Sequence, residues 1–292
     1  MDSDTSTLAQ SLGIGITTKD RWDDLADTLE ELKKWGLDKC QIIVTDDGSD
    51  NPCPPEKQAL YPFVKWQRFE KSQGLITQRN RLARTLTTDY YLSLDDDSFP
   101  VTGSLADAVN YFRTHPDVHT LALNMSDKRG GAPRIDASLP PFQSRQFVGC
   151  AVMHDRRKLI AIGGLREELK FYCEEADLSA RMLEKGQKVV VFPSVVICHN
   201  RSKINRVSSL RSFQWARSKA LLVIWTFPLA VMPLRLTLGV LGRIKESPEN
   251  WLSTVQGFLK GLVDGFGALS KRTPMSMKTY REWHHSPWPP SC

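Results

Sequence analysis

Apolar β-type segments and amphipathic helical segments alternate from about residue 12 to residue 192, and this alternation constrains the fold more than any other feature. The β-type segments are at residues 13–18, 41–44, 63–66, 90–94, 121–123 and 147–153, and the helical segments are at residues 22–32, 76–86 and 105–112. Strand–helix alternation is typical of a mainly parallel sheet flanked by helices. Such sheets bind ligands beyond the carboxyl ends of their strands. The sequence therefore predicts an α/β fold with a site at that edge.

Three adjacent carboxylates follow the apolar segment at residues 90–94. They belong to Asp95, Asp96 and Asp97. Like charges this close repel strongly in a partly desolvated site, so a bound cation is their natural partner. Oxygen ligands suit hard divalent cations such as Mg²⁺ or Mn²⁺, which keep open positions for phosphate oxygens. The triplet therefore predicts an enzyme that handles a metal-bound phosphate or diphosphate.

A second acidic turn, at residues 46–49, follows the predicted strand at 41–44. Asp and Gly are common in turns, so this segment alone is a weak indication of function. At the same sheet edge as the triplet, however, one of its carboxylates can accept hydrogen bonds from the base or ribose of a nucleotide.

Composition and charge narrow the class of protein. The chain has 292 residues, of which 41% are hydrophobic and 25% charged, which is ordinary for one large globular domain with an appendage. Its 39 basic and 33 acidic side chains leave a net charge of +6, and we expect no nucleic-acid partner. The N-terminus has neither the basic nor the apolar segment of a secretory signal, and the six cysteines have no regular spacing. These features predict a cytoplasmic protein with reduced thiols.

The charge and hydrophobicity of the chain change near residue 200. Residues 201–220 contain six basic side chains and no acidic one, and the fourteen residues 221–234 are strongly apolar but interrupted by two prolines. A bilayer span needs about 20 residues. A basic segment beside an apolar one, with Trp215 and Trp225, is typical of a helix in the membrane interface. A helical hairpin packed on the catalytic domain explains the same pattern, so both interpretations stay open.

These patterns divide the chain into four parts. We expect an N-terminal tail at residues 1–10, a catalytic domain at 11–205, a C-terminal helical region at 206–272 and a flexible tail at 273–292. In the helical region, glycines 257, 261 and 265 repeat every four residues, which permits close packing of helices.

An ordered set of motifs between residues 12 and 200 resembles glycosyltransferase family 2. The matching motifs are residues 42–49, Gly74 through Arg79-Asn80, residues 91–97, Gly163-Gly164-Leu165, residues 174–181 and His199. The resemblance implies an inverting enzyme of the GT-A fold, in which a Rossmann-like, mainly parallel sheet is flanked by helices. It also implies a nucleotide-sugar donor (a UDP-, GDP- or dTDP-sugar) and Mn²⁺ or Mg²⁺ as cofactor.

The resemblance assigns roles to the acidic triplet. Asp95 and Asp97 match the two acids of the DxD motif and are expected to be metal ligands, and His199 is expected to complete the metal site. Asp95 also belongs to the expected nucleotide-sugar site, and Asp96 is expected to face the ribose or the water shell of the metal.

Other residues are expected to bind the nucleotide sugar. Asp47 matches the residue that contacts the nucleotide base, with Thr17 and Thr18 lining the same pocket. Arg79 matches the first residue of the family's Arg-Asn pair, although a salt-bridged helix face explains that pair equally well.

The catalytic base is expected in the acidic segment at residues 174–177. Glu175 fills the second position of the family's acidic pair, where Asp is commoner than Glu. The reaction requires one carboxylate within hydrogen-bond distance of the acceptor hydroxyl. Glu174 and Asp177 remain alternatives, and acids at a helix start also complement the helix dipole.

The predicted reaction is a metal-dependent, inverting sugar transfer to a hydroxyl of a glycan or lipid-linked acceptor. The C-terminal third is similar to that of bacterial cell-envelope glycosyltransferases, rhamnosyltransferases among them, so we expect peripheral attachment to the cytoplasmic face of a membrane. A degenerate, non-catalytic nucleotide-sugar-binding or scaffold protein is the alternative from another class. A sugar nucleotidyltransferase is less favoured, because residues 13–19 lack the Gly- and Arg-rich phosphate loop of such enzymes.

Overall fold

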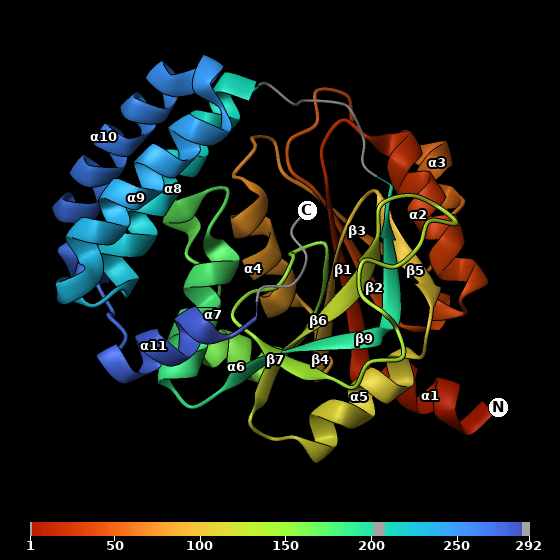
Figure 1. Ribbon diagram of the computed structural model, residues 1–292. Coiled ribbons are helices and arrows are strands. Elements are labelled where there is room, and N and C mark those ends of the chain that lie inside the picture. The colour runs from red at the N-terminus through yellow and green to blue at the C-terminus, as the bar shows by residue number, and fades with distance from the viewer. Residues whose placement is uncertain (1, 201–207, 288–292) are drawn as a thin grey trace.

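The computed structural model describes residues 2–200 and 208–287, and Figure 1 shows one twisted sheet with helices on both sides. The strand order is β3-β2-β1-β4-β8-β6-β9-β5, and β7 pairs with β9. The strands are β1 (Leu12–Thr18), β2 (Gln41–Asp46), β3 (Val64–Arg68), β4 (Tyr90–Asp95), β5 (Ser98–Thr102), β6 (Val118–Ser126), β7 (Phe142–Ser144), β8 (Ala151–Asp155) and β9 (Lys188–His199). Strands β1, β2, β3, β4, β6 and β9 run in one direction, and β5, β7 and β8 run against them. The predicted mainly parallel α/β sheet is confirmed.

The strands are buried on both faces, so alternate side chains enter two different cores. On β2, Ile42 and Val44 face the core that α2 and α5 cover, whereas Ile43 faces the core that α4, α7 and α8 cover. The helices are α1 (Asp2–Ser11), α2 (Trp22–Lys34), α3 (Pro55–Ala59), α4 (Leu75–Thr85), α5 (Leu105–Thr114), α6 (Arg156–Ala161), α7 (Glu174–Glu184), α8 (Ser208–Thr226), α9 (Met232–Glu246), α10 (Trp251–Gly267) and α11 (Met277–His285).

The predicted strands and helices are present, with one shift in position. The strand expected at residues 147–153 begins only at Ala151, and residues 147–150 form the turn before it. The backbone N–H of Ala151 donates to the carbonyl of Val148 at 3.0 Å and closes this turn. An apolar sequence alone does not distinguish such a buried turn from a strand.

Both segments expected to be tails contain helices that pack on the domain. Residues 2–11 form α1, and its Leu8 and Ala9 pack against the core. In the C-terminal segment, α11 buries Tyr280 and Trp283, and Trp283 Nε1 donates to Ser179 Oγ of α7 at 2.9 Å. Tertiary packing orders these short segments, whose isolated propensity is weak. The expected boundary at residues 205–206 lies outside the described residues.

Helix α8 packs on the catalytic domain, as the helical-hairpin interpretation predicted. Its last turns are buried in the second core, and Trp225 is fully buried instead of facing a membrane. The small residues of α10 face α8: a Cβ added at Gly257 would lie 2.1 Å from the carbonyl oxygen of Phe213. The glycine repeat therefore permits the close helix contact that the sequence predicted.

The outer faces of α9 and α10 expose large apolar side chains. They are Leu234, Leu238 and Leu241 on α9, and Trp251, Leu252, Leu259, Val263 and Phe266 on α10. Figure 1 shows these two helices at the edge of the molecule, beyond α8. None of the helices in the described part of the chain combines the length and apolar composition that crossing a bilayer requires.

Candidate active site

The strand register gathers the predicted site residues at one edge of the sheet. Thr17 at the end of β1 pairs with Asp95 at the end of β4. Because these strands are parallel, their carboxyl ends lie at the same edge. His199 at the end of β9 pairs with Ser98 at the start of β5, directly after the acidic triplet. The fold therefore places His199 beside acids that are distant in sequence.

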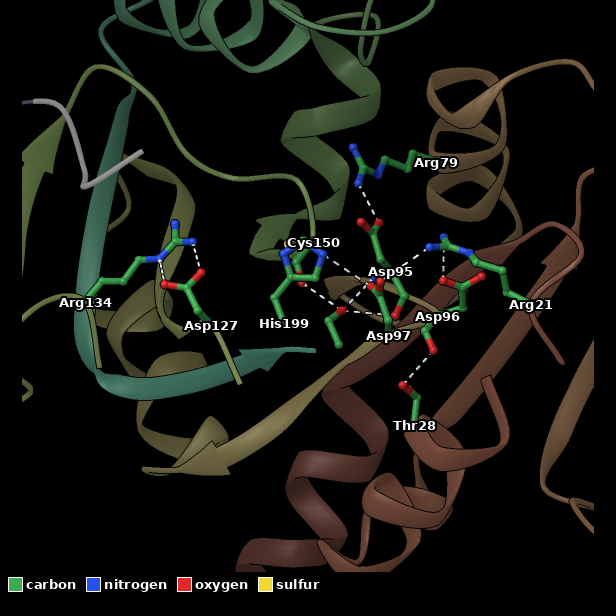
Figure 2. Close-up of polar contacts among 11 residues, drawn as sticks. Arg21, Thr28, Arg79, Asp95, Asp96, Asp97, Asp127, Arg134, Cys150 and His199 are labelled. Atoms are coloured by element: carbon green, nitrogen blue, oxygen red, sulfur yellow. Dashed lines mark hydrogen bonds and ion pairs between the residues drawn. The ribbon is translucent and has the colours of Figure 1, made fainter. Parts of the chain in front are cut away.

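Asp95, Asp97 and His199 come together as expected, and a cysteine joins them (Figure 2). His199 Nε2 lies 3.3 Å from Asp97 Oδ1, and His199 Nδ1 lies 3.4 Å from Cys150 Sγ. A carboxylate oxygen of Asp95, a ring nitrogen of His199 and Cys150 Sγ all lie within 4.8 Å of one another. Carboxylate and imidazole donors fit a divalent cation, and Asp95 and His199 could supply them, with Asp97 beside His199.

Asp96 is buried against Arg21, and its expected contact with a ribose or with metal-bound water stays a prediction. Its carboxylate has no exposed surface, and Oδ1 lies 2.6 Å from Nη2 of Arg21. Its backbone carbonyl accepts a hydrogen bond from Thr28 Oγ1 of α2 at 2.8 Å. Burial raises the pKa of Asp96 to about 8, although Arg21 opposes this rise. The middle residue of the triplet points inward because the turn after β4 packs on α2.

Arg79 is buried among the carboxylates. Its Nη2 lies 2.8 Å from Asp95 Oδ1, and its Nη1 lies 3.5 Å from Glu174 Oε1. Gly149 packs directly on the guanidinium, since an added Cβ would lie 2.2 Å from Arg79 Nη1. Burial lowers the pKa of Arg79, but Asp95 and Glu174 raise it above its ordinary value. The charged guanidinium therefore joins the acidic triplet to the acidic start of α7.

Glu174 and Glu175 form a coupled pair at the start of α7. Burial raises the pKa of Glu174 to about 8, the carboxyl of Glu175 adds to the rise, and Arg79 opposes it. Burial also raises the pKa of Glu175, while Arg79, backbone donors and a hydrogen bond from Glu174 act in the other direction. Both carboxyls therefore keep their protons to higher pH than an exposed glutamate does, and Arg79 limits the rise in both pKa values.

A cavity of about 340 Å³ lies beside these residues. The site residues that line it are Arg79, Asp95, Cys150, Glu174, Glu175 and His199. The wall contributed by the C-terminal region consists of Trp215, Lys219 and Leu222 of α8 and Trp283 of α11. Residues that could ligate a cation, a carboxyl pair and an aromatic wall thus share one cavity of a size suited to a small ligand.

Comparison with known proteins places the chain in a family. Residues 14–164, just over half of the 292 residues, match the family described as Glycosyl transferase family 2. The chain belongs to glycosyltransferase family 2. This membership argues against the sugar nucleotidyltransferase alternative. No curated protein matches the chain.

Solved structures confirm that this glycosyltransferase has the GT-A fold. One similar structure is GalNAc-T7 with UDP, GalNAc and Mn²⁺ (15% identity, TM-score 0.61, 85% of this chain and 54% of that one). Another is the mannosyltransferase PcManGT from Pyrobaculum calidifontis with GDP-Man and Mn²⁺ (15% identity, TM-score 0.58, 94% and 78%). A third is S. aureus TarS 1–349 with UDP-GlcNAc (14% identity, TM-score 0.60, 89% and 83%). The chain spans about half the length of GalNAc-T7.

Asp177, the third candidate for the base of this glycosyltransferase, lies outside the cavity. It has no exposed surface, and its oxygens contact Arg166 at 3.1 Å, Arg181 at 2.7 Å and Thr226 at 2.8 Å. These contacts tie α7 to the segment that precedes it, through Arg166, and to the end of α8, through Thr226. Asp177 therefore has a structural role, and the choice of base narrows to Glu174 and Glu175.

Asp47 organises the loop before α4. Oδ1 accepts hydrogen bonds from the N–H of Gln73 at 2.8 Å and from Gln78 Nε2 at 2.6 Å, while Oδ2 accepts from Ser72 Oγ at 2.6 Å and from the N–H of Gly74 at 2.9 Å. Burial raises the pKa of Asp47, but these hydrogen bonds hold it below its ordinary value. The carboxylate thus fixes the loop that follows β3.

Thr17 and Thr18 end β1 at the same edge as Asp47. Both side chains are buried, and the Thr18 hydroxyl lies against the carboxylate of Asp96. Asp47 and the two threonines do not line the cavity formed by the described residues. Their expected nucleotide contacts stay predictions.

Proposed function

We propose that this glycosyltransferase moves a sugar, with inversion, from a nucleoside diphosphate sugar to a hydroxyl group, with a divalent cation held at Asp95 and His199 and with Asp97 orienting the His199 ring through Nε2. The observation that carries the proposal is that Asp95 and His199 line the same cavity as Glu174 and Glu175. When bound, Mn²⁺ or Mg²⁺ stabilises the negative charge of the departing diphosphate. The presence of Mn²⁺ in GalNAc-T7 and PcManGT, with UDP and GDP-Man respectively, supports this cofactor and donor class.

Glu175 is the proposed general base. Its ionised carboxylate removes the proton of the acceptor hydroxyl as the oxygen attacks the anomeric carbon. Glu174 keeps its proton and donates a hydrogen bond to Glu175, which holds the base in one orientation. One displacement from the side opposite the diphosphate inverts the anomeric configuration.

Arg79 positions both halves of the site. It contacts Asp95 on the cation side and Glu174 on the base side. Because the guanidinium is rigid, it fixes the spacing between the two carboxylates. The spacing matters because misplacing the base relative to the anomeric carbon by about 1 Å can lower the rate 10²-fold.

The C-terminal wall of the cavity supports a glycan or lipid-linked glycan as acceptor. Trp215 and Trp283 present aromatic surface to the cavity, against which the apolar faces of sugar rings can pack. Lys219 adds a cation that can bind phosphate or carboxylate groups of such an acceptor. A role in cell-envelope polysaccharide or glycolipid synthesis follows from this acceptor class.

A donor panel tests the proposed reaction. UDP-, GDP- and dTDP-sugars are incubated with the protein, with Mn²⁺, with Mg²⁺ or with chelator, and the released nucleoside diphosphate is measured. Glu175→Gln and Asp97→Asn should each lower turnover by at least about 10²-fold. The control Glu168→Gln removes a half-exposed carboxylate that pairs with Lys271 away from the cavity, and it should retain turnover. Undiminished turnover in either site variant contradicts the assigned roles, and nucleotide-sugar binding without any turnover supports the degenerate-protein alternative.

We also propose that α9 and α10 attach the enzyme to the cytoplasmic face of an anionic membrane. Leu238 on α9 and Leu259 on α10 are 51% and 55% exposed. Exposed Lys245, Lys260 and Lys271 lie on or next to these helices, Lys260 paired with Asp264 and Lys271 with Glu168. Apolar side chains beside basic ones are typical of interfacial helices.

Vesicle flotation tests the attachment. The double variant Leu238→Glu with Leu259→Glu should lose binding to vesicles that contain an anionic phospholipid, while its turnover on a soluble acceptor stays unchanged. Leu60→Glu is the matched control, because Leu60 is 65% exposed after α3 on the other side of the molecule. Wild-type protein that fails to float at low salt rules the attachment out.

A further inference from the structure

Cys150 occupies a defined position beside the proposed cation site. It ends the turn at residues 147–150 and is only 2% exposed. Ser98 Oγ donates to its backbone carbonyl at 3.1 Å, and Ser98 Oγ also accepts from the backbone N–H of Asp95 at 2.8 Å. The same hydroxyl therefore holds both the end of β4 and the start of β8. Figure 2 shows Cys150 next to His199, on the side that also faces Asp95.

The sulfur takes part in a convergent set of metal-ligating atoms. Asp95, Cys150 and His199 come from three segments of the sheet edge, and one potential ligand atom from each lies within 4.8 Å of the other two. His199 directs Nδ1 at Cys150 Sγ, 3.4 Å away, and Nε2 at Asp97. A buried cysteine that served only as a small apolar side chain would not need to meet both an imidazole and a carboxylate.

We propose that Cys150 binds the cation together with Asp95 and Nδ1 of His199, so that this enzyme's metal site has an oxygen, nitrogen and sulfur donor set. Asp97 contacts the opposite ring nitrogen of His199 and holds the imidazole in this orientation. The inference rests on the proposed function, because it concerns the same cation. Thiolate is a soft ligand that favours Co²⁺, Zn²⁺ and Cd²⁺ over Mg²⁺, whereas carboxylates suit Mg²⁺ and Mn²⁺ equally well. The site therefore binds thiophilic cations more tightly than a site of carboxylates and one imidazole does.

Optical spectroscopy of the Co²⁺-loaded full chain tests this assignment directly, because only a cobalt–sulfur bond gives a sulfur-to-cobalt charge-transfer band in the near ultraviolet. The wild type should show this band, and Cys150→Ser should lose it while remaining folded by circular dichroism. Cys198→Ser is the matched control: Cys198 is equally buried and precedes His199, but its side chain contacts Ser126. This control should keep the band.

Cation affinities give a second measurement. In Cys150→Ser the dissociation constant for Cd²⁺ should rise by at least about tenfold, and that for Mg²⁺ should change by less than about threefold. Equal changes for the two cations, or Co²⁺ binding to the wild type without the sulfur band, would overturn the ligand role of Cys150. In both cases metal-dependent donor turnover would leave the proposed function intact. A wild type that binds no divalent cation and turns over no donor would instead contradict the proposed function.

Discussion

Replacing Glu174 with Gln should distinguish the carboxyl that holds a proton, proposed to be Glu174, from the catalytic base, proposed to be Glu175. The pKa of Glu174 rises from its ordinary value of 4.5 to about 8, mainly because the carboxyl is buried. Between these two pH values the folded chain binds a proton that the unfolded chain releases, so wild-type stability is greatest at low pH and falls as the pH rises toward 8. At about 1.4 kcal/mol for each pKa unit, the full loss is roughly 5 kcal/mol.

Glutamine resembles the protonated acid and does not titrate. In Glu174→Gln the free energy of unfolding should therefore lack this pH dependence, and the variant should exceed the wild type by several kcal/mol above about pH 8. Urea unfolding of both proteins from about pH 5 to about pH 9 measures the difference. Asp96, whose pKa is also about 8, is present in both proteins, so its contribution cancels in the comparison.

The pH dependence of kcat/KM reports independently on the protonation of Glu174. The side-chain amide that Glu174→Gln introduces would still donate a hydrogen bond to Glu175. The variant should therefore keep most of the wild-type kcat/KM near neutral pH and lose the alkaline decline that deprotonation of Glu174 causes in the wild type. Stability curves that run parallel for the two proteins would refute the argument. A loss of activity as large as that of Glu175→Gln would instead identify Glu174 as the base.

Three further substitutions test the packing around the site. Gly149→Ala should lower the free energy of unfolding by about 1–3 kcal/mol and lower kcat, because the new Cβ displaces the guanidinium of Arg79. Urea unfolding and donor turnover measure the two effects, and unchanged turnover contradicts the positioning role of Arg79. Trp283→Ala should lower the free energy of unfolding by about 3–5 kcal/mol, since this side chain is buried in the core that α11 closes, and a loss below about 1 kcal/mol would show that α11 does not stabilise the domain. Asp177→Ala should lower the free energy of unfolding by about 3–5 kcal/mol, because Arg166 and Arg181 stay buried without this carboxylate. A variant that keeps its stability but loses turnover would indicate that Asp177 is the base.

Local periodicity predicts most of the strands and helices around the site, and the order of the family motifs predicts part of the site itself. The strands expected at residues 13–18 and 90–94, and the helix expected at 76–86, could be predicted because apolar periodicity is a property of neighbouring residues. The expected proximity of Asp95, Asp97 and His199 followed from the family motifs, and the strand register provides it.

Residues whose roles depend on distant partners could not be predicted from the sequence. The inward orientation of Asp96 depends on Arg21, just before α2. The acidic triplet itself gives no indication of that partner. A lone cysteine in an apolar segment gives no indication of the imidazole that Cys150 meets. The cavity wall formed by α8 and α11 likewise depends on packing between segments that lie beyond the motifs.

The central claim is that the cation ligands and the base serve one cavity. Anomalous diffraction from crystals soaked with Mn²⁺ and a nucleoside diphosphate tests it most directly. We expect a manganese peak contacted by Asp95 and His199, with the terminal phosphate of the nucleotide directed toward Glu175. A manganese peak elsewhere, or a nucleotide bound with its phosphates away from this cavity, would contradict the account.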